Sequence, residues 1–171
     1  ATGILTVRNP AILKVPENYT TIQSAIDAAI PLDVIQVSNG TYYEHLIVNK
    51  PQINIIGENR NTTIIDGSEN GTVIRVIEDR VTLSSFTIQN SGPGFEYGMD
   101  CIVLLESDGN NITNNQIRNG QEGIFLQDSC DNTIHGNILT QIDDSAISIW
   151  SGSRNEISQN TMANNTFGIY L

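Results

Sequence analysis

Cationic residues are scarce in this sequence. The 171 residues include 8 Lys and Arg against 19 Asp and Glu, which gives a formal net charge of -11. Binding to nucleic acid depends on Lys and Arg that neutralise phosphates, so nucleic acids are excluded as partners, as are anionic membrane surfaces. A chain of this length suits one domain with a sizeable core.

Long hydrophobic runs are also missing. No apolar stretch reaches the roughly 20 residues that a helix needs to cross a bilayer, so we expect no insertion into a membrane. The chain begins at Ala1 without a cleavable signal. We therefore expect either a mature chain or an excerpt of a longer one.

Only two cysteines and two histidines are present. Cys101 and Cys130 fall at different phases of the repeat described below, which favours two buried free thiols over a disulfide, with pairing left open. His45 and His135 stand apart from any Cys or carboxylate at metal-ligand spacing, so we expect no metal site.

Asparagine, by contrast, is abundant and creates several Asn-x-Ser/Thr sequons. Such sequons accept N-linked glycans on the surface loops of secreted proteins, so they favour a location outside the cell. The glycosylation candidates are Asn18, Asn39, Asn61, Asn70, Asn111 and Asn164.

The second half of the sequence repeats itself. Isoleucine recurs at intervals of 22, 23 and 22 residues, at Ile102, Ile124, Ile147 and Ile169. Asparagine recurs in phase with it, at Asn110, Asn132 and Asn155 and again at Asn115, Asn137 and Asn160. Each unit alternates apolar and polar residues between Asn and Gly, which indicates short strands joined by turns. Coils stacked about 4.8 Å apart would place like residues over one another.

The sequence therefore predicts an all-β fold, a single-stranded right-handed parallel β-helix of about seven coils. In the less regular first half, Phe86 takes the phase of Asn115, and residues 91–99 form an insertion at a turn. We expect one domain, with an N-terminal strand and cap helix over 1–31, irregular coils over 32–99 and regular repeats over 100–171. The alternative is that this domain is part of a longer solenoid.

One helix is predicted, at TTIQSAIDAAI. Thr20 and Gln23 form a capping box in this prediction, Ile22, Ile26 and Ile30 share one face, and the following proline ends the helix. A short amphipathic helix ahead of a β-solenoid is best interpreted as the cap that covers its first coil.

Residues 19–67 resemble the opening of pectin-lyase-like β-helix proteins. The resemblance lies in the TIQSAIDAA, NGTYYE and INIIGENRNTTIIDG segments. The later repeats look like the carbohydrate-binding and sugar-hydrolase (CASH) repeats of archaeal and bacterial surface proteins. This resemblance implies the β-helix, but the fold hosts lyases, esterases, hydrolases, epimerases and non-enzymatic surface proteins.

The segment QIDDSAISIW contains an acidic pair that resembles the catalytic DD of polygalacturonases. By phase, Asp143 and Asp144 take the DD position and Glu122 takes the acid of the preceding NTD motif. The match is incomplete, because Phe167 stands in the place of the histidine of GHG, Gly120 replaces the Asn of NTD, and no RIK motif occurs. We therefore favour a polar turn, with a catalytic carboxylate cluster as the alternative.

Other activities of the fold are matched less well. Pectin methylesterases carry later DFIFG-like and LGRPW-like stretches, which this sequence lacks. A pectate lyase needs a Ca²⁺ site beside a basic residue, and no spacing of acids in this sequence indicates such a site. We therefore favour exposed surface charge and expect no cofactor, with bound Ca²⁺ as the alternative. The available groups would be Glu106, Asp108, Asp128 and Asp131, with Arg118 or Arg154.

Three aromatic residues fall at related phases near the same strand. Phe125, Trp150 and Tyr170 are candidates for a groove that stacks sugar rings, and packing between coils is the alternative.

Residues 167–171 begin a new coil with no residue that blunts its edge, and residues 2–7 form an apolar strand that could pair with it. We expect copies of the chain to join head to tail. The functional hypothesis is an extracellular, cell-surface module of archaeal type, structural in a surface layer, sheath or filament, or binding a polysaccharide or surface glycan. The alternative is a polysaccharide-degrading hydrolase or lyase, or a fragment of one.

Overall fold

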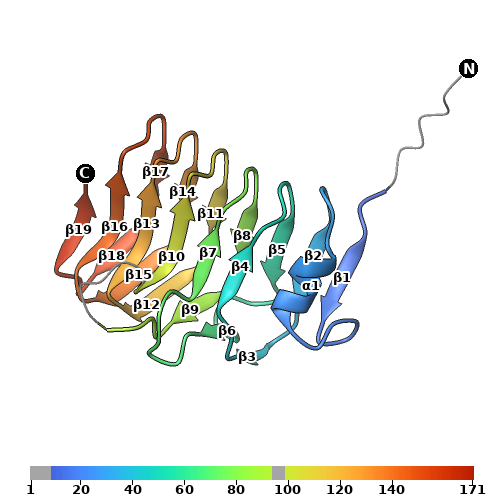
Figure 1. The fold of residues 1–171 in the computed structure, drawn as a ribbon. Helices are drawn as coiled ribbons and strands as arrows, with labels where there is room; N and C mark the ends of the chain where they lie inside the picture. Colours follow the sequence, from blue (N-terminus) through green and yellow to red (C-terminus); the bar gives the residue numbers. More distant parts are fainter. Residues whose placement is uncertain (1–8, 94–98) are drawn as a thin grey trace, which may run out of the picture.

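The computed structural model describes residues 9–93 and 99–171. These residues form a right-handed parallel β-helix of about seven coils, with one short helix within the described part. The strand pairs of the described residues are parallel, and each strand pairs with the strand at the same position in a neighbouring coil. The coils stack side by side from β1 to β19 in Figure 1.

Three sheets form the walls of the solenoid, and they are named A, B and C here. Sheet A contains β1 (Ile12–Val15), β2 (Val34–Val37), β5 (Asn54–Gly57), β8 (Thr82–Ser84), β11 (Asn111–Thr113), β14 (Thr133–His135) and β17 (Glu156–Ser158). Sheet B contains β3 (Gly40–Tyr42), β6 (Thr63–Asp66), β9 (Thr87–Gln89), β12 (Gln116–Gly120), β15 (Ile138–Ile142) and β18 (Thr161–Ala163). Sheet C contains β4 (Leu46–Val48), β7 (Ile74–Val76), β10 (Asp100–Leu105), β13 (Glu122–Gln127), β16 (Ser145–Trp150) and β19 (Phe167–Tyr170).

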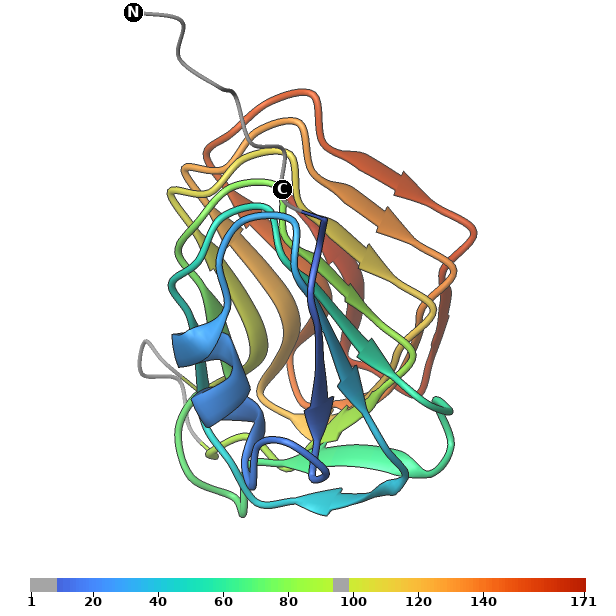
Figure 2. The ribbon, with the colours of Figure 1, turned by 90° about the vertical axis from the view of Figure 1, so that its right-hand side faces the viewer.

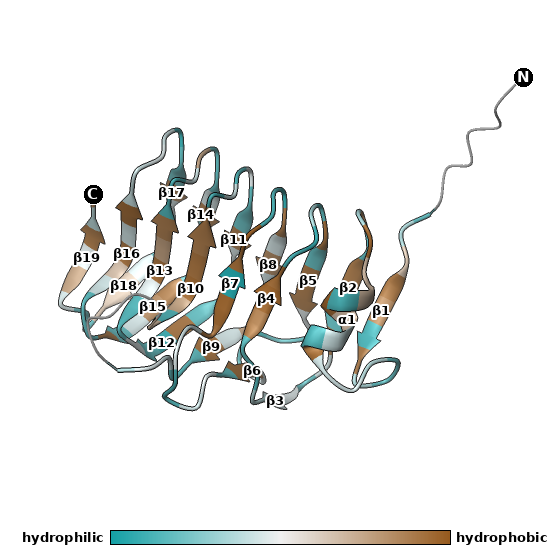
Figure 3. Ribbon diagram, in the orientation of Figure 1, coloured by the Kyte–Doolittle hydropathy of each residue, from teal (hydrophilic) through white to brown (hydrophobic). Residues whose placement is uncertain are grey.

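The predicted columns of isoleucine form the core. Ile124 pairs in register with Ile102 on one side and with Ile147 on the other, and all three side chains are fully buried. A fully buried isoleucine contributes about 1.5–3 kcal/mol through the apolar surface that it removes from water. Figure 3 shows the apolar strands running from coil to coil. The repeat of 22 or 23 residues is therefore confirmed as one circuit of the helix.

Asparagine columns line two of the turns. The backbone N–H of Asn115 donates to Oδ1 of Asn137 at 2.9 Å, and the N–H of Asn137 donates to Oδ1 of Asn160 at 2.9 Å. The Asn137 amide nitrogen also donates to the carbonyl of Ile112 at 2.8 Å. A parallel column joins Asn110, Asn132 and Asn155. Each side chain thus satisfies backbone groups that the turn leaves unpaired.

Phe86 ends the first of these columns as the phase predicts. Its N–H donates to Oδ1 of Asn115 at 3.0 Å, while its ring is fully buried in the core. The insertion over 91–99 includes residues 94–98, which lie outside the described part. The longer coil is nevertheless visible in the register, since Ile74 pairs with Ile102, 28 positions on.

The cap helix is α1 (Ile22–Ala28), and its predicted start and length were wrong by a few residues. Thr21 is the N-cap and forms the capping box with Ser24, so the Thr20–Gln23 box is not the one used. Ile22 and Ile26 are fully buried, but Ile30 lies beyond the helix and is 48% exposed. The helix lies across the N-terminal end of the stack (Figure 2).

Both cysteines are free thiols, with Cys101 buried in the core and Cys130 partly buried. In the described part of the chain, no helix is long and apolar enough to span a membrane. The expected N-terminal pairing strand, residues 2–7, lies outside the described residues. Head-to-tail association of copies therefore stays a prediction.

Candidate functional site: a carboxylate corner between two sheets

The acidic pair lies where the chain turns from sheet B into sheet C. Asp143 and Asp144 form a bend between β15 and β16. Their N–H groups donate to the carbonyls of Gly120 at 3.0 Å and Gln121 at 2.9 Å in the preceding coil. The backbone thus fixes both residues, but their side chains meet different surroundings.

Asp143 lines a cavity of about 390 Å³, called here the corner groove. Amide side chains from successive coils form its wall, and Asn119 Nδ2 donates to Asn90 Oδ1 at 3.3 Å. Asn90, Asn119 and Gln141 each adopt a left-handed backbone, which asparagine tolerates better than most residues. The remaining lining residues are Glu69, Ser91, Gly92, Pro93, Gly120 and Gln121.

Gln121 is the residue of the corner groove with a buried side-chain atom that lacks a hydrogen bond among the described residues. It is 7% exposed, and its amide nitrogen Nε2 has no hydrogen-bond partner among the described residues. The backbone of Gln121 is held by Ser91, whose Oγ accepts its N–H at 3.2 Å. A buried donor without a partner is costly, so a ligand that accepts its hydrogen bond would be stabilised there.

A second group of acids, called here the acidic cluster, lies on the other side of the bend. It contains Asp100, Glu122 and Asp144. Asp100 and Glu122 are register partners on β10 and β13, which places two carboxyls on adjacent strands. Oε2 of Glu122 and Oγ of Ser148 are both buried without a hydrogen-bond partner among the described residues.

Burial favours the neutral forms of Glu122 and Asp100. Burial, together with the negative charges of Asp100 and Asp144, raises the pKa of Glu122 to about 7. The nearby Ser148 hydroxyl lowers the pKa of Glu122, although its geometry is not that of a standard hydrogen bond. Burial also raises the pKa of Asp100 to about 6, against the effect of the Arg75 guanidinium.

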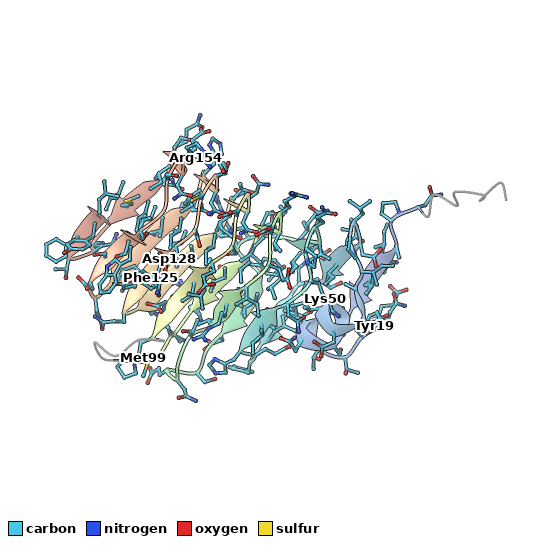
Figure 4. The ribbon with its side chains drawn as sticks, turned by 45° about the horizontal axis from the view of Figure 1, so that its top comes forward. Tyr19, Lys50, Met99, Phe125, Asp128 and Arg154 are labelled. Atoms are coloured by element: carbon cyan, nitrogen blue, oxygen red, sulfur yellow. The ribbon has the colours of Figure 1, made fainter. Side chains whose placement is uncertain are left out.

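The aromatic candidates lie on the same sheet, on β13, β16 and β19 (Figure 4 labels Phe125). Phe125 is 7% exposed and meets Trp150 edge to face, with ring centroids 5.8 Å apart. Trp150 and Tyr170 are about half exposed, so their rings offer surface that Phe125 does not. Ser148 pairs in register with Phe125 on one side and Tyr170 on the other, and its hydroxyl also lies near the carboxyl of Glu122.

The other predicted residues are dispersed over the surface. Five sequon asparagines are exposed and Asn111 is half-buried in β11. Arg154, at the rim in Figure 4, binds both carboxylate oxygens of Asp131 at 2.6 Å. No group of three or more His, Cys, Asp or Glu within residues 9–93 and 99–171 is arranged to hold a metal ion.

Several residues of the site were not predicted from the sequence. They are Asp100, Gln121, Ser148 and Arg75. The phase of the repeat was the available signal, since Asp100 precedes Glu122 by one coil and Ser148 follows Phe125 by one coil.

The stacked parallel strands and the polar corner define a β-solenoid of the pectin-lyase-like class. Within that class, residues 17–171 match the NosD family, described as periplasmic copper-binding protein, and the chain belongs to this family. A comparison with curated proteins gave no significant match.

Solved structures with the same fold include several pectin methylesterases. One, in complex with a hexasaccharide, has a TM-score of 0.65 and 15% identity over 84% of this chain and 55% of its own. The enzyme from carrot has a TM-score of 0.53 and 14% identity over 97% and 83% of the two chains. ORF18 of Geobacillus virus E2 has a TM-score of 0.58 and 16% identity over 87% and 40%. The chain spans just over half of the first of these structures, and such low identities indicate a shared fold alone.

The family description names copper, and the described residues do not fit a copper centre. Imidazole, thiolate and thioether groups are the ligands that copper prefers. His45 is exposed before β4 and contacts the carbonyl of Thr72, whereas His135 lies on sheet A and contacts Ser158. Cys101 is buried in the core, and burial raises the pKa of its thiol to about 12, which opposes the thiolate form that binds metals.

Proposed function

We propose that this protein is a module that acts outside the cytoplasm and binds a glycan in the corner groove. The observation that carries the proposal is the buried amide nitrogen of Gln121, which has no hydrogen-bond partner within residues 9–93 and 99–171 and belongs to a groove of about 390 Å³ walled by amides and carboxylates. Sugar-binding sites commonly combine such planar polar groups with exposed aromatic rings, and Trp150 and Tyr170 lie on the adjoining sheet C. The periplasmic description of the family supports the location.

A larger groove on sheet A supports glycan binding less well. Its volume is about 470 Å³ and its lining includes Lys14, Gln36 and Glu58. Lys14 is paired with Glu17, and Glu58 accepts the N–H of Asn39 at 2.9 Å. None of the buried unpartnered polar atoms of the described residues belongs to this groove. A ligand in this groove would therefore satisfy fewer unpaired polar groups.

A glycan array followed by calorimetry tests the proposal. The intact protein should bind at least one oligosaccharide, and Gln121→Ala should weaken binding about tenfold, which corresponds to the loss of one hydrogen bond to a buried group. Gln36→Ala, in the groove on sheet A, is the matched control and should bind like the parent protein. Absence of binding to every neutral, anionic and cationic glycan, or full binding by Gln121→Ala, would refute the proposal.

The raised pKa of Glu122 favours a second candidate, a polysaccharide-degrading enzyme. A carboxyl with a pKa of about 7 is suited to protonate a leaving oxygen, while an ionised carboxylate activates water. Asp143 or Asp144 would supply that second carboxylate. Release of reducing sugar by the protein, lost in Glu122→Gln and in the double variant Asp143→Asn, Asp144→Asn, would favour the enzyme. Release that both variants retain would come from a contaminant.

A further inference from the structure

The acidic cluster gathers three carboxyl groups at the starts of three neighbouring strands of sheet C, β10, β13 and β16. Asp100 and Glu122 are partners on adjacent strands, and Asp144 acts on Glu122 from the bend that precedes β16. Arg75, from β7, is the cation that offsets the charge of Asp100. No cation among the described residues contributes in the same way to Glu122, in a protein whose formal net charge is -11. A positively charged ligand would be attracted to this cluster.

The unpartnered atoms next to the acids indicate that a hydrogen-bond donor fits there. Ser148 is 1% exposed, its Oγ has no partner among the described residues, and it lies against the carboxyl of Glu122. Oε2 of Glu122 is buried and also lacks a partner. An ammonium group has three donors and no acceptor, so it can satisfy the carboxylate oxygen and the hydroxyl oxygen together.

The aromatic rings lie where the rest of a sugar would extend from that ammonium group. Trp150 follows Ser148 by two positions on β16, a distance of about 7 Å along a strand. The indole is 45% exposed and is supported by the edge-to-face contact with Phe125. Aromatic faces bind both sugar rings and cations, so the rings and the acids favour the same ligand.

Alternative ligands fit the cluster less well. A uronic acid would add a fourth carboxylate to a cluster that already holds three. A metal ion would need ligands that converge, and the described residues contain no such group. A neutral sugar hydroxyl donates a hydrogen bond but does not offset the charge.

We infer that the acidic cluster is a subsite for the protonated amino group of an amino sugar, so that the bound glycan carries free amines instead of carboxylates. Glu122, Asp144 and Ser148 receive the ammonium group, and Trp150 stacks on the sugar ring. This inference rests on the proposed glycan binding. It also separates this protein from the pectin methylesterases of the same fold, whose name refers to pectin.

Calorimetry with three matched hexasaccharides tests the inference. The probes are a hexamer of β-1,4-linked glucosamine, its fully N-acetylated form and hexagalacturonate, at a mildly acidic pH that keeps the amines protonated. The intact protein should bind the glucosamine hexamer about tenfold or more tightly than the acetylated form. Hexagalacturonate should bind most weakly.

Two double variants separate the subsite from the overall charge of the chain. Glu122→Gln with Asp144→Asn should reduce the preference for the amine to about twofold or less. Glu17→Gln with Asp27→Asn makes the same change in net charge on exposed residues of the first coil and should retain the full preference. Circular dichroism and the midpoint of unfolding check that both variants fold.

Proton release gives an independent readout. An ammonium group beside Glu122 lowers the pKa of that carboxyl, so binding should release a proton, seen as a dependence of the binding heat on the ionisation heat of the buffer. Glu122→Gln should abolish this release.

The outcomes also distinguish this inference from the proposed function. Equal affinity for the amino and acetylated hexamers, or equal loss of preference in both double variants, overturns the amino-sugar subsite and leaves glycan binding in place. Binding to no glycan overturns both.

Discussion

At the scale of single residues, Asn137 shows how the asparagine columns hold the turns, because both polar atoms of its side chain form hydrogen bonds. Asn137 is fully buried and contacts Asn115, Ile112 and Asn160 through hydrogen bonds of 2.8–3.2 Å. Removal of this side chain deletes its hydrogen bonds to two backbone groups of the preceding coil and to a side chain of the following coil. The cost therefore reaches beyond the residue that is replaced.

Asn137→Ala should lower the free energy of unfolding by about 2 kcal/mol or more, because it leaves the Asn115 N–H buried without its partner and removes a hydrogen bond to the Ile112 carbonyl. Urea denaturation measures the change. Asn61→Ala, on an exposed residue, is the control and should change the stability by about 0.5 kcal/mol or less. Equal effects of the two substitutions would show that the column adds nothing beyond ordinary surface polarity.

The raised pKa of Glu122 makes the free energy of unfolding decrease as the pH rises. The folded protein holds the proton of Glu122 up to a pKa of about 7, whereas the unfolded chain releases it near the ordinary value of 4.5. Between these values the folded state binds more protons, so its stability is greatest below the unfolded-state value and falls as pH rises through the window.

Glu122→Gln should remove this part of the pH dependence. We expect the parent protein to lose about 2 kcal/mol more than the variant between about pH 5 and about pH 8, a figure reduced for the solvent that reaches Glu122. Urea unfolding at both pH values gives the comparison. A variant whose stability falls as steeply as that of the parent would contradict a raised pKa at Glu122.

The sequence predicted which coils contain the acids of this site, but not the surroundings of each acid. The phase of the repeat correctly related Glu122 to the coil of Asp143 and Asp144, because register in a stacked solenoid follows the sequence period. It did not separate the two aspartates, of which one lines the corner groove and the other acts on Glu122. That difference depends on side-chain directions at a bend, where the strand alternation no longer holds.

At the scale of elements, helix α1 depends on a residue far along the chain. Glu44, in the segment before β4, accepts the N–H of Ile22 at 2.9 Å and that of Gln23 at 3.0 Å. Thr21 accepts a third N–H, from Ser24, at 3.1 Å. Together they satisfy the N–H groups that the first turn of any helix leaves free, and a carboxylate also suits the positive end of the helix.

Glu44→Ala should therefore destabilise the protein by about 1–2 kcal/mol, mainly by fraying the cap helix. Hydrogen exchange of the α1 amides together with thermal unfolding gives the measurement. Glu17→Ala provides the matched control, because Glu17 is exposed and forms only a surface pair with Lys14, worth about 1 kcal/mol or less. Unchanged protection of α1 in Glu44→Ala would count against this role.

The same contact explains why the predicted capping box was off by one residue. Thr20 and Thr21 are both suitable N-caps by composition, and a local rule cannot choose between them. The choice is made by a carboxylate 22 positions downstream that reaches Ile22 and Gln23. Amphipathic spacing predicted the buried Ile22 and Ile26 correctly, since that signal is local.

At the scale of the whole molecule, each coil is stabilised by the coil before it and the coil after it. The three sheets run the length of the stack, and the core contains one shared cluster of buried residues. Access to the interior therefore requires that neighbouring coils separate.

Cys101 reports this separation because it is fully buried between coils, with its pKa raised to about 12 by burial. In a Cys130→Ser variant, a thiol reagent should label Cys101 only as fast as the stack opens, with labelling that accelerates as urea is added. In a Cys101→Ser variant, the partly buried Cys130 should react without denaturant. Rapid labelling of Cys101 in the native protein would contradict a closed core.

The overall architecture could be predicted best from the sequence, for a physical reason. The same residue type occurs at the same position of successive coils, as at Ile102, Ile124 and Ile147, so each coil gives independent evidence for the fold. The groove and the cluster occur once each, at a corner where no repetition marks them. Their chemistry became visible only when burial and partners were known.

The coil that contains residues 91–99 has a wider implication. Register between Ile74 and Ile102 is kept across 28 positions, against 22 between Ile102 and Ile124, so winding resumes after extra residues enter at the corner. The corner can therefore change in length and chemistry while the wall behind it keeps its geometry. For protein engineering, this makes the junction after β9 a natural point for grafting recognition loops onto an unchanged scaffold, and the same freedom would let evolution diversify ligands without a new fold.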